Sequence, residues 1–192
     1  KSVPFPEILC RICDEPCGRA CLRGERGEPV RIRMIERAAV EYGRETPSRR
    51  PLIRKKQRAI VAGAGLAGLT AAKELGRKGY AVTGRVPEDR AGGELLLLPE
   101  SVLPRDIVQR AVASLPETVT VRTGAATLSP REEWDAAFLA DARFLPDMAG
   151  DRFSLVTSDP VVFAPDHRTE TSPVLLLSYG KRAALSMDRV FQ

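Results

Sequence analysis

The sequence predicts an α/β fold of the Rossmann type. An apolar run over residues 59–62 leads directly into Gly63, Gly65 and Gly68. Leucines and alanines then recur at helical spacing as far as Leu75. A strand, a tight turn and a helix in this order form the first unit of a dinucleotide-binding fold. We therefore expect the rest of the chain to be organised around this turn.

The glycines of the turn fit the binding of a pyrophosphate. Glycine lets the chain turn sharply, lets backbone N–H groups approach the anion, and lets the helix pack close to the strand. The alternative is a glycine-rich turn that serves packing alone. The candidate cofactor-binding residues of the turn are Gly63, Ala64, Gly65, Leu66, Ala67 and Gly68.

Length and composition limit what can be built around the turn. A chain of 192 residues with 43% hydrophobic residues has room for one medium-sized domain and a small appendage. No apolar run reaches the length of a membrane span, and the N-terminal residues lack the apolar core of a signal peptide. We expect a cytoplasmic protein without a membrane span.

The net charge of +5 is unevenly distributed, since the cationic excess lies within residues 1–58. Nucleic-acid binding is disfavoured, because Phe5 and Tyr42 are the only aromatic residues in this part and no nucleic-acid motif occurs. The same charge suits docking on an acidic redox partner or a neighbouring subunit, or a solvated surface. We expect a protein partner rather than a nucleic acid.

All the cysteines of the chain lie in one short segment with the spacing C-x2-C-x3-C-x3-C. Thiols so close together suit a compact cluster, whereas structural zinc sites usually pair two knuckles across a longer loop. Two disulfides in such a short loop would be strained, although zinc and a redox CxxC remain alternatives. The spacing favours a [4Fe–4S] cluster with the ligands Cys10, Cys13, Cys17 and Cys21.

The residues after the cysteines predict a helix that ends at Gly43 and seats the cysteine loop on the larger domain. Residues 44–57 contain two prolines and a cationic run and are expected to form an exposed connector. The predicted organisation is a cysteine arm over residues 1–43, this linker, and a Rossmann-like domain over residues 58–192. One face of the predicted helix is apolar, with Met34, Ile35, Ala38, Ala39 and Tyr42.

Taken together, these segments resemble one known family. A CxxxPCxxxC run, a PVxI helix, a basic linker and a GAGxAGLxAAxxLxxxGYAVT segment are similar to the N-terminal region of the glutamate synthase small-subunit family. That family includes the flavin modules of dihydropyrimidine dehydrogenase and the transhydrogenase-type bifurcating enzymes. Residues 91–112, 132–142 and 161–192 resemble its later segments. The resemblance implies a Rossmann-like FAD-binding domain with a small N-terminal α-helical iron–sulfur arm.

The resemblance also implies further flavin-site residues. It places Arg90, Gly92 and Gly93 close to the flavin, and it places Asp166 at the ribityl phosphate side. Ser172 and Pro173 are typical of a helix N-cap and first turn, and in the family the corresponding helix points its N-terminus at the flavin.

Some positions depart from the family pattern. The acid expected at the end of the second strand, which binds the ribose hydroxyls, is Val86 here, and Glu88 is the nearest substitute. Residues 140–142 replace the family's ATG turn, and Pro165 replaces the glycine before Asp166. These departures bear directly on whether the chain retains FAD.

The family inserts an NAD(P)H-binding domain between the segments that correspond to residues 135–142 and 160–168. Only residues 143–159 lie in that interval here, whereas a nucleotide-binding βαβ unit needs about 30 residues or more. A second dinucleotide domain does not fit. We therefore do not expect this chain alone to take hydride from NAD(P)H.

The expected function is electron transfer inside a larger redox complex, between a [4Fe–4S] cluster and bound FAD. The alternatives are a free-standing NAD(P)H-dependent flavin oxidoreductase and a structural subunit that has lost the chemistry. The expected partners are other subunits of a multi-subunit oxidoreductase, with an acidic ferredoxin-like protein among the candidates. No catalytic residue is assigned, since the lone His167 lacks a nucleophile beside it. Trp134 and Phe138 are expected to pack under the sheet.

Overall fold

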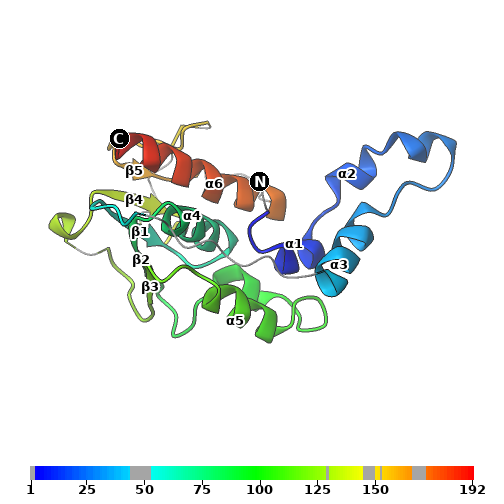
Figure 1. Cartoon of the computed structure of the whole chain (residues 1–192), viewed down its shortest axis with the longest axis horizontal. Coiled ribbons are helices and arrows are strands. Elements are labelled where there is room, and N and C mark those ends of the chain that lie inside the picture. Colours follow the sequence, from blue (N-terminus) through cyan, green and yellow to red (C-terminus); the bar gives the residue numbers. More distant parts are fainter. Residues whose placement is uncertain (1–2, 44–52, 129, 145–149, 152, 166–171) are drawn as a thin grey trace.

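The computed structural model describes residues 3–43, 53–128, 130–144, 150–151, 153–165 and 172–192 (Figure 1). Within these residues, five strands form one sheet in the order β3-β2-β1-β4-β5, and every neighbouring pair is parallel. The order reverses between β1 and β4, which is the arrangement of a Rossmann-like fold. The strands are β1 Arg58–Ala62, β2 Ala81–Arg85, β3 Val119–Arg122, β4 Ala136–Leu139 and β5 Val162–Phe163.

Strands β1 and β4 are almost continuously apolar, as is typical of strands that are buried on both faces of the sheet. Alternate residues point to opposite faces of the sheet. On one face Val61 and Phe138 pack with the helices α4 and α6, and on the other face Ile60 and Leu139 pack around Trp134. The prediction that Trp134 and Phe138 belong to the core is therefore confirmed.

Helix α4 (Leu66–Arg77) follows β1, and α6 (Pro173–Val190) lies beside it in Figure 1. The predicted cap of α6 is confirmed, since the Leu175 N–H donates to Ser172 Oγ at 3.3 Å and Pro173 occupies the first turn. A methyl group on Gly180 would overlap the carbonyl oxygen of Ala67 in α4. Glycine at this position is what lets the two helices approach so closely.

A second part of the core joins the N-terminal segment to the domain. Helix α1 (Pro6–Ile12) packs with α5 (Arg105–Ala113), and α5 packs with the 3-10 helix η2 (Gly93–Leu97). Phe5 and Ile8 are fully buried in the same cluster as Leu66 and Leu69 of α4. The chain therefore enters the domain core before it reaches most of the cysteines.

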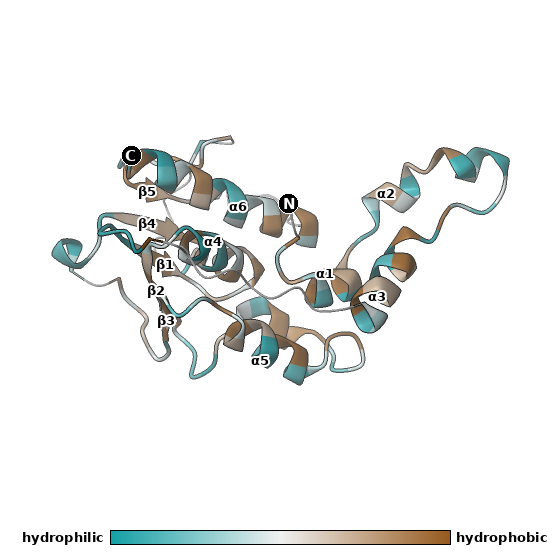
Figure 2. Cartoon of the chain, in the orientation of Figure 1, coloured by the Kyte–Doolittle hydropathy of each residue, from teal (hydrophilic) through white to brown (hydrophobic). Residues whose placement is uncertain are grey.

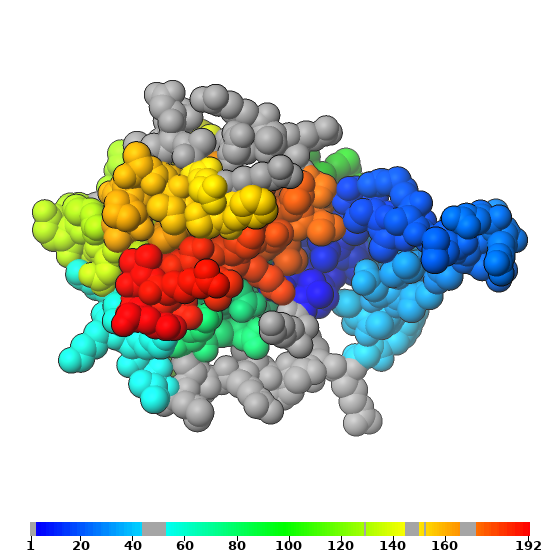
Figure 3. All heavy atoms as spheres, turned by 90° about the horizontal axis from the view of Figure 1, so that it is seen from above, coloured from blue at the N-terminus to red at the C-terminus, as the bar shows by residue number. Residues whose placement is uncertain are grey.

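The remainder of the arm extends away from this body, as Figures 1 and 3 show. It consists of α2 (Pro16–Arg19), η1 (Leu22–Arg26) and α3 (Ile32–Tyr42). Outside the arm, a further 3-10 helix, η3 (Arg131–Glu133), precedes β4. Helix α3 contacts α1, where Arg11 Nη2 lies 2.9 Å from Glu41 Oε1. The predicted apolar face of α3 stays exposed within the described part of the chain, and Figure 2 shows hydrophobic residues on this helix.

Among the helices that the structure describes, none combines the length and the apolar composition that a membrane crossing requires.

A buried carboxylate fastens the end of α6 to the start of β2. Asp188 is 6% exposed, and its oxygens lie 2.6 Å from both Lys78 Nζ and Tyr80 Oη and 3.3 Å from Lys55 Nζ. Burial alone would raise the pKa of Asp188, but the hydrogen bonds from Lys78 and Tyr80 outweigh it and lower the pKa to about 2.

Replacing Asp188 by asparagine is expected to lower the free energy of unfolding at pH 7 by about 2 kcal/mol. The folded-state pKa lies below the ordinary value of 3.8, so the ionised group stabilises the fold above pH 3.8 and this contribution is lost as pH falls through about 2. Urea unfolding at pH 7 and at low pH would measure the difference, which should shrink at the lower pH. Asp106→Asn, on the exposed face of α5, is the matched control.

Candidate dinucleotide and cysteine sites

A cavity of about 550 Å³ lies where β1 and β4 end, at the point where the strand order reverses. Ligands of open α/β sheets bind in this crevice. Its walls are the turn after β1, the loop after β4, the start of η2, and Leu176 and Tyr179 of α6. The structure brings many of the predicted cofactor-binding residues to its surface: Gly63, Ala64, Gly65, Ala67, Gly68, Glu88 and Gly93.

The three glycines of the turn differ in how strictly the structure requires them. Gly63 has a φ of 102°, and a Cβ there would lie 2.7 Å from Asp141 Cβ. A Cβ on Gly68 would overlap the carbonyl oxygen of Gly63, so this glycine allows α4 to pack against the strand end. Gly65 is the N-cap of α4, and its φ of −75° is open to any residue. Side chains at Gly63 and Gly68 would therefore collide with neighbouring atoms, and without them the backbone of the turn lies open to the cavity.

Leu66 contributes to the site through its backbone rather than its side chain. The side chain is fully buried in the core with Leu69, and Leu66 is not among the residues that line the cavity. Its N–H donates to Glu94 Oε1 at 2.8 Å. The N-terminus of α4 therefore already holds an anionic group, which is the chemistry expected of this position.

Glu94 was not predicted from the sequence. Its carboxylate lies over the turn so closely that a methyl group on Gly65 would overlap it. Desolvation, and to a smaller extent the nearby Asp141 carboxylate, raise the pKa of Glu94. Hydrogen bonds from the N–H groups of Leu66 and of Glu94 itself lower the pKa but do not cancel the rise. The available signal was an acidic residue directly after the glycine pair of the family pattern.

The glycine pair explains how Glu94 comes so near. Gly92 and Gly93 have φ values of 139° and 49°, which favour glycine. A Cβ on Gly93 would lie 3.0 Å from Gly65 N, so η2 begins in direct contact with the turn. Gly92 does not line the cavity, and a Cβ there would lie 2.7 Å from Leu96 Cγ.

Three charged groups meet at another wall of the cavity. Arg143 Nη2 lies 2.6 Å from Glu88 Oε1, and Arg143 Nε lies 3.0 Å from Asp141 Oδ1. The hydrogen bonds to Asp141 and then to Glu88 raise the pKa of Arg143 above its usual range. Arg143 and Asp141 were not predicted as site residues, since only the fold brings the β4 loop to Glu88.

The remaining predicted flavin residues fall in different places. Val86, at the position expected to be acidic, is fully buried in the core and does not line the cavity. Arg90 is exposed and Ser172 caps α6, and both lie outside the cavity lining. Asp166 and His167 lie outside the described residues.

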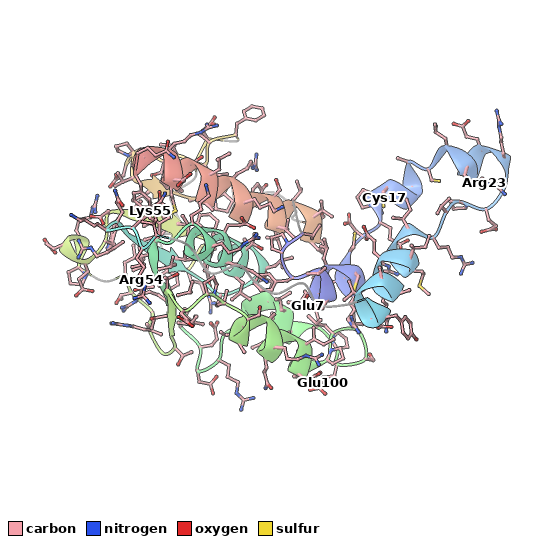
Figure 4. All side chains as sticks on the ribbon, in the orientation of Figure 1. Glu7, Cys17, Arg23, Arg54, Lys55 and Glu100 are labelled. Carbon is pink, nitrogen blue, oxygen red and sulfur yellow. The ribbon has the colours of Figure 1, made fainter. Side chains whose placement is uncertain are left out.

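The four cysteines differ in their surroundings. Cys10 is 4% exposed on α1, Cys13 ends that helix, Cys17 is exposed on α2 (Figure 4), and Cys21 precedes η1. They are free thiols. Within the described residues, no group of three or more His, Cys, Asp or Glu side chains is placed to hold a metal ion. The predicted four-sulfur centre is therefore not assembled in this conformation.

Three of the thiols have recognisable influences on their pKa. Burial raises the pKa of Cys10 and of Cys13. The Glu15 N–H donates to Cys13 Sγ at 3.4 Å and offsets part of the rise in the pKa of Cys13. The backbone N–H groups of Val30, Arg23 and Gly24 lower the pKa of Cys21. Thiols with nearby backbone donors are a donor set that suits an iron–sulfur or zinc centre.

The fold and the cavity define the class of this chain as a Rossmann-like α/β domain with a glycine-turn site and a small N-terminal helical arm. No protein-family model matches the chain. Over 119 residues it is 35% identical to "Glutamate synthase [NADPH] small chain" of Bacillus subtilis, which covers 60% of this chain and 24% of that protein. It is 31% identical over 117 residues to "NADPH-Fe(3+) oxidoreductase subunit beta" of Geobacter sulfurreducens, covering 58% and 17%.

These relatives confirm the resemblance to the glutamate synthase small-subunit family. The chain spans about a quarter or less of the length of the two relatives. Among solved structures, it is similar to 6-hydroxypseudooxynicotine amine oxidase of Pseudomonas geniculata N1, with 23% identity, a TM-score of 0.39, and coverage of 60% of this chain and 18% of that one.

Proposed function

We propose that the chain is an electron-transfer subunit of a larger oxidoreductase, in which a [4Fe–4S] cluster in the arm exchanges electrons with FAD in the glycine-turn cavity. The observation that carries the proposal is the cavity at the reversal point of the sheet, where the Leu66 N–H at the N-terminus of α4 donates to the carboxyl group of Glu94 and shows that an acceptor fits there. The names of the two relatives, a glutamate synthase small chain and an oxidoreductase subunit, support a redox role.

The glycine turn would hold the pyrophosphate of FAD. The Leu66 N–H would donate to it, Gly63, Gly65 and Gly68 would keep side chains out of its way, and Glu88 would accept from ribose hydroxyls once Arg143 releases it. Leu176 and Tyr179 of α6 would form the apolar wall. Bound FAD supplies a centre that can exchange electrons in pairs or one at a time.

The arm would carry the cluster on Cys10, Cys13, Cys17 and Cys21. A [4Fe–4S] cluster transfers single electrons. The N–H groups beside Cys13 and Cys21 would stabilise the thiolates and tune the potential. Helix α1 joins the cysteine segment to the core next to the glycine turn, since Ile8 and Leu66 belong to one cluster. The start of the arm and the residue after the glycine turn therefore share one part of the hydrophobic core.

Electrons would come from, or pass to, other subunits. The interval over residues 143–159 is too short for a second nucleotide-binding unit, so a partner would provide any NAD(P)H site. The basic stretch that precedes β1 offers charge for an acidic partner such as a ferredoxin-like protein.

The visible spectrum and the metal content of anaerobically purified protein test this function. We expect flavin absorption together with a broad iron–sulfur shoulder, and about four irons per chain. A shoulder without flavin would instead support a cluster-carrying scaffold. Zinc as the sole metal, or a colourless protein, would contradict the proposal. Oxidation of NAD(P)H without any partner would support a free-standing flavin oxidoreductase.

A further inference from the structure

We propose that Glu94 is a built-in competitor for the dinucleotide: its carboxylate occupies the anion position at the N-terminus of α4, and the pyrophosphate binds only when this side chain leaves. The inference rests on the proposed function, because it concerns the regulation of the same cavity. It is carried by the position of Glu94 and by the charges that surround it.

The first support is the position of the carboxylate. Oε1 accepts the Leu66 N–H at 2.8 Å, and the carboxylate lies where a side chain on Gly65 would begin. A pyrophosphate on this helix needs the same N–H and the same space above Gly65. The two anions are therefore mutually exclusive.

The second support is the charge of the cavity. Glu88, Glu94 and Asp141 all line it, and among the described lining residues Arg143 is the cation that faces them. Arg143 is held by Glu88 and Asp141. A pyrophosphate would add negative charge to this group, so Glu94 in place would oppose it by repulsion as well as by overlap.

The third support is that Glu94 can leave without a change in the fold. The residue is exposed, and η2 has an anchor other than the Glu94 side chain, since Leu95 is buried in the same cluster as Leu66 and Leu69. Rotation of the side chain out of the cavity is enough to open the anion position. The unliganded protein then spends part of its time open, and the apparent affinity falls in proportion to that part.

The test is a titration of the 192-residue protein, freed of flavin, with FAD and separately with ADP. Glu94→Ala is expected to bind both about tenfold or more tightly than the wild type, since one charge-assisted hydrogen bond no longer competes. Glu94→Gln keeps the size and the acceptor but loses the charge, so an intermediate affinity is expected. Glu100→Ala is the matched control, because Glu100 (labelled in Figure 4) lies in the loop after η2 and outside the cavity lining.

A second readout does not depend on affinity. The Leu66 amide resonance in a ¹⁵N-labelled sample is expected to shift in Glu94→Ala without ligand, and ADP is expected to shift it in the wild type. Equal affinities of wild type and Glu94→Ala would overturn the inference and leave the proposed function standing. Weaker binding by Glu94→Ala would also overturn it, because Glu94 would then be a ligand contact. Failure of all variants to bind FAD and ADP would overturn the proposed function and this inference together.

Discussion

Valine in place of Gly65 is expected to weaken FAD binding strongly while the protein still folds. The backbone at Gly65 is extended, so valine adopts it without strain. The first added atom meets the Glu94 carboxylate, which is the end of a flexible side chain and can rotate away. The branched side chain then covers the N-terminus of α4, and the loss of charge-assisted hydrogen bonds to the pyrophosphate should weaken binding by about 100-fold or more.

Gly68→Ala provides the comparison for this result. The added methyl group would overlap the Gly63 carbonyl oxygen, which is main chain and cannot rotate away. We expect Gly68→Ala to lose stability as well as binding, whereas Gly65→Val loses binding alone. FAD titration and thermal unfolding of both variants separate the two effects. Wild-type affinity in Gly65→Val would show that the turn is not the pyrophosphate site.

Gly180→Val is expected to lower the free energy of unfolding by about 3 kcal/mol, because it overpacks the contact between α4 and α6. The side chain would overlap Ala67 O and crowd Thr70 Cβ, so the two helices must separate. The gain in helix propensity on replacing glycine is at most about 1 kcal/mol and does not compensate.

Urea unfolding would measure this loss. Gly18→Val, on α2 of the arm, is the control, since its nearest neighbour to an added Cβ is Glu15 Cβ at 3.6 Å. An equal loss in both variants would show that the effect comes from valine in a helix and not from the contact between α4 and α6.

The sequence was informative wherever the determinant is local. The spacing of Gly63, Gly65 and Gly68 predicts the strand, turn and helix because the positive φ of Gly63 and the contact of Gly68 with the Gly63 carbonyl oxygen arise within the turn itself. Ser172 and Pro173 predict the start of α6 for the same reason, since a cap is satisfied within its own first turn.

The parts that were missed depend on contacts between distant segments. Glu94 and Leu66 meet because the segment after β2 folds back over the turn, and Arg143 reaches Glu88 because the β4 and β2 ends lie at one edge of the sheet. No spacing rule contains such contacts. The cysteine spacing likewise does not predict that Cys10 lies on helix α1, which packs on the core.

The burial of Phe5 and Ile8 has a consequence for how the molecule holds together. Both side chains are fully buried beside Leu66 and Leu69, and Lys73 Nζ lies 4.1 Å from the centre of the Phe5 ring. Each buried side chain of this size stabilises the fold by about 1.5–3 kcal/mol. A variant truncated to begin at Arg58 would lack both side chains and would have a cavity beside Leu66 and Leu69. The segment that carries the cysteines is therefore anchored at its beginning, through side chains that belong to the same hydrophobic cluster as helix α4.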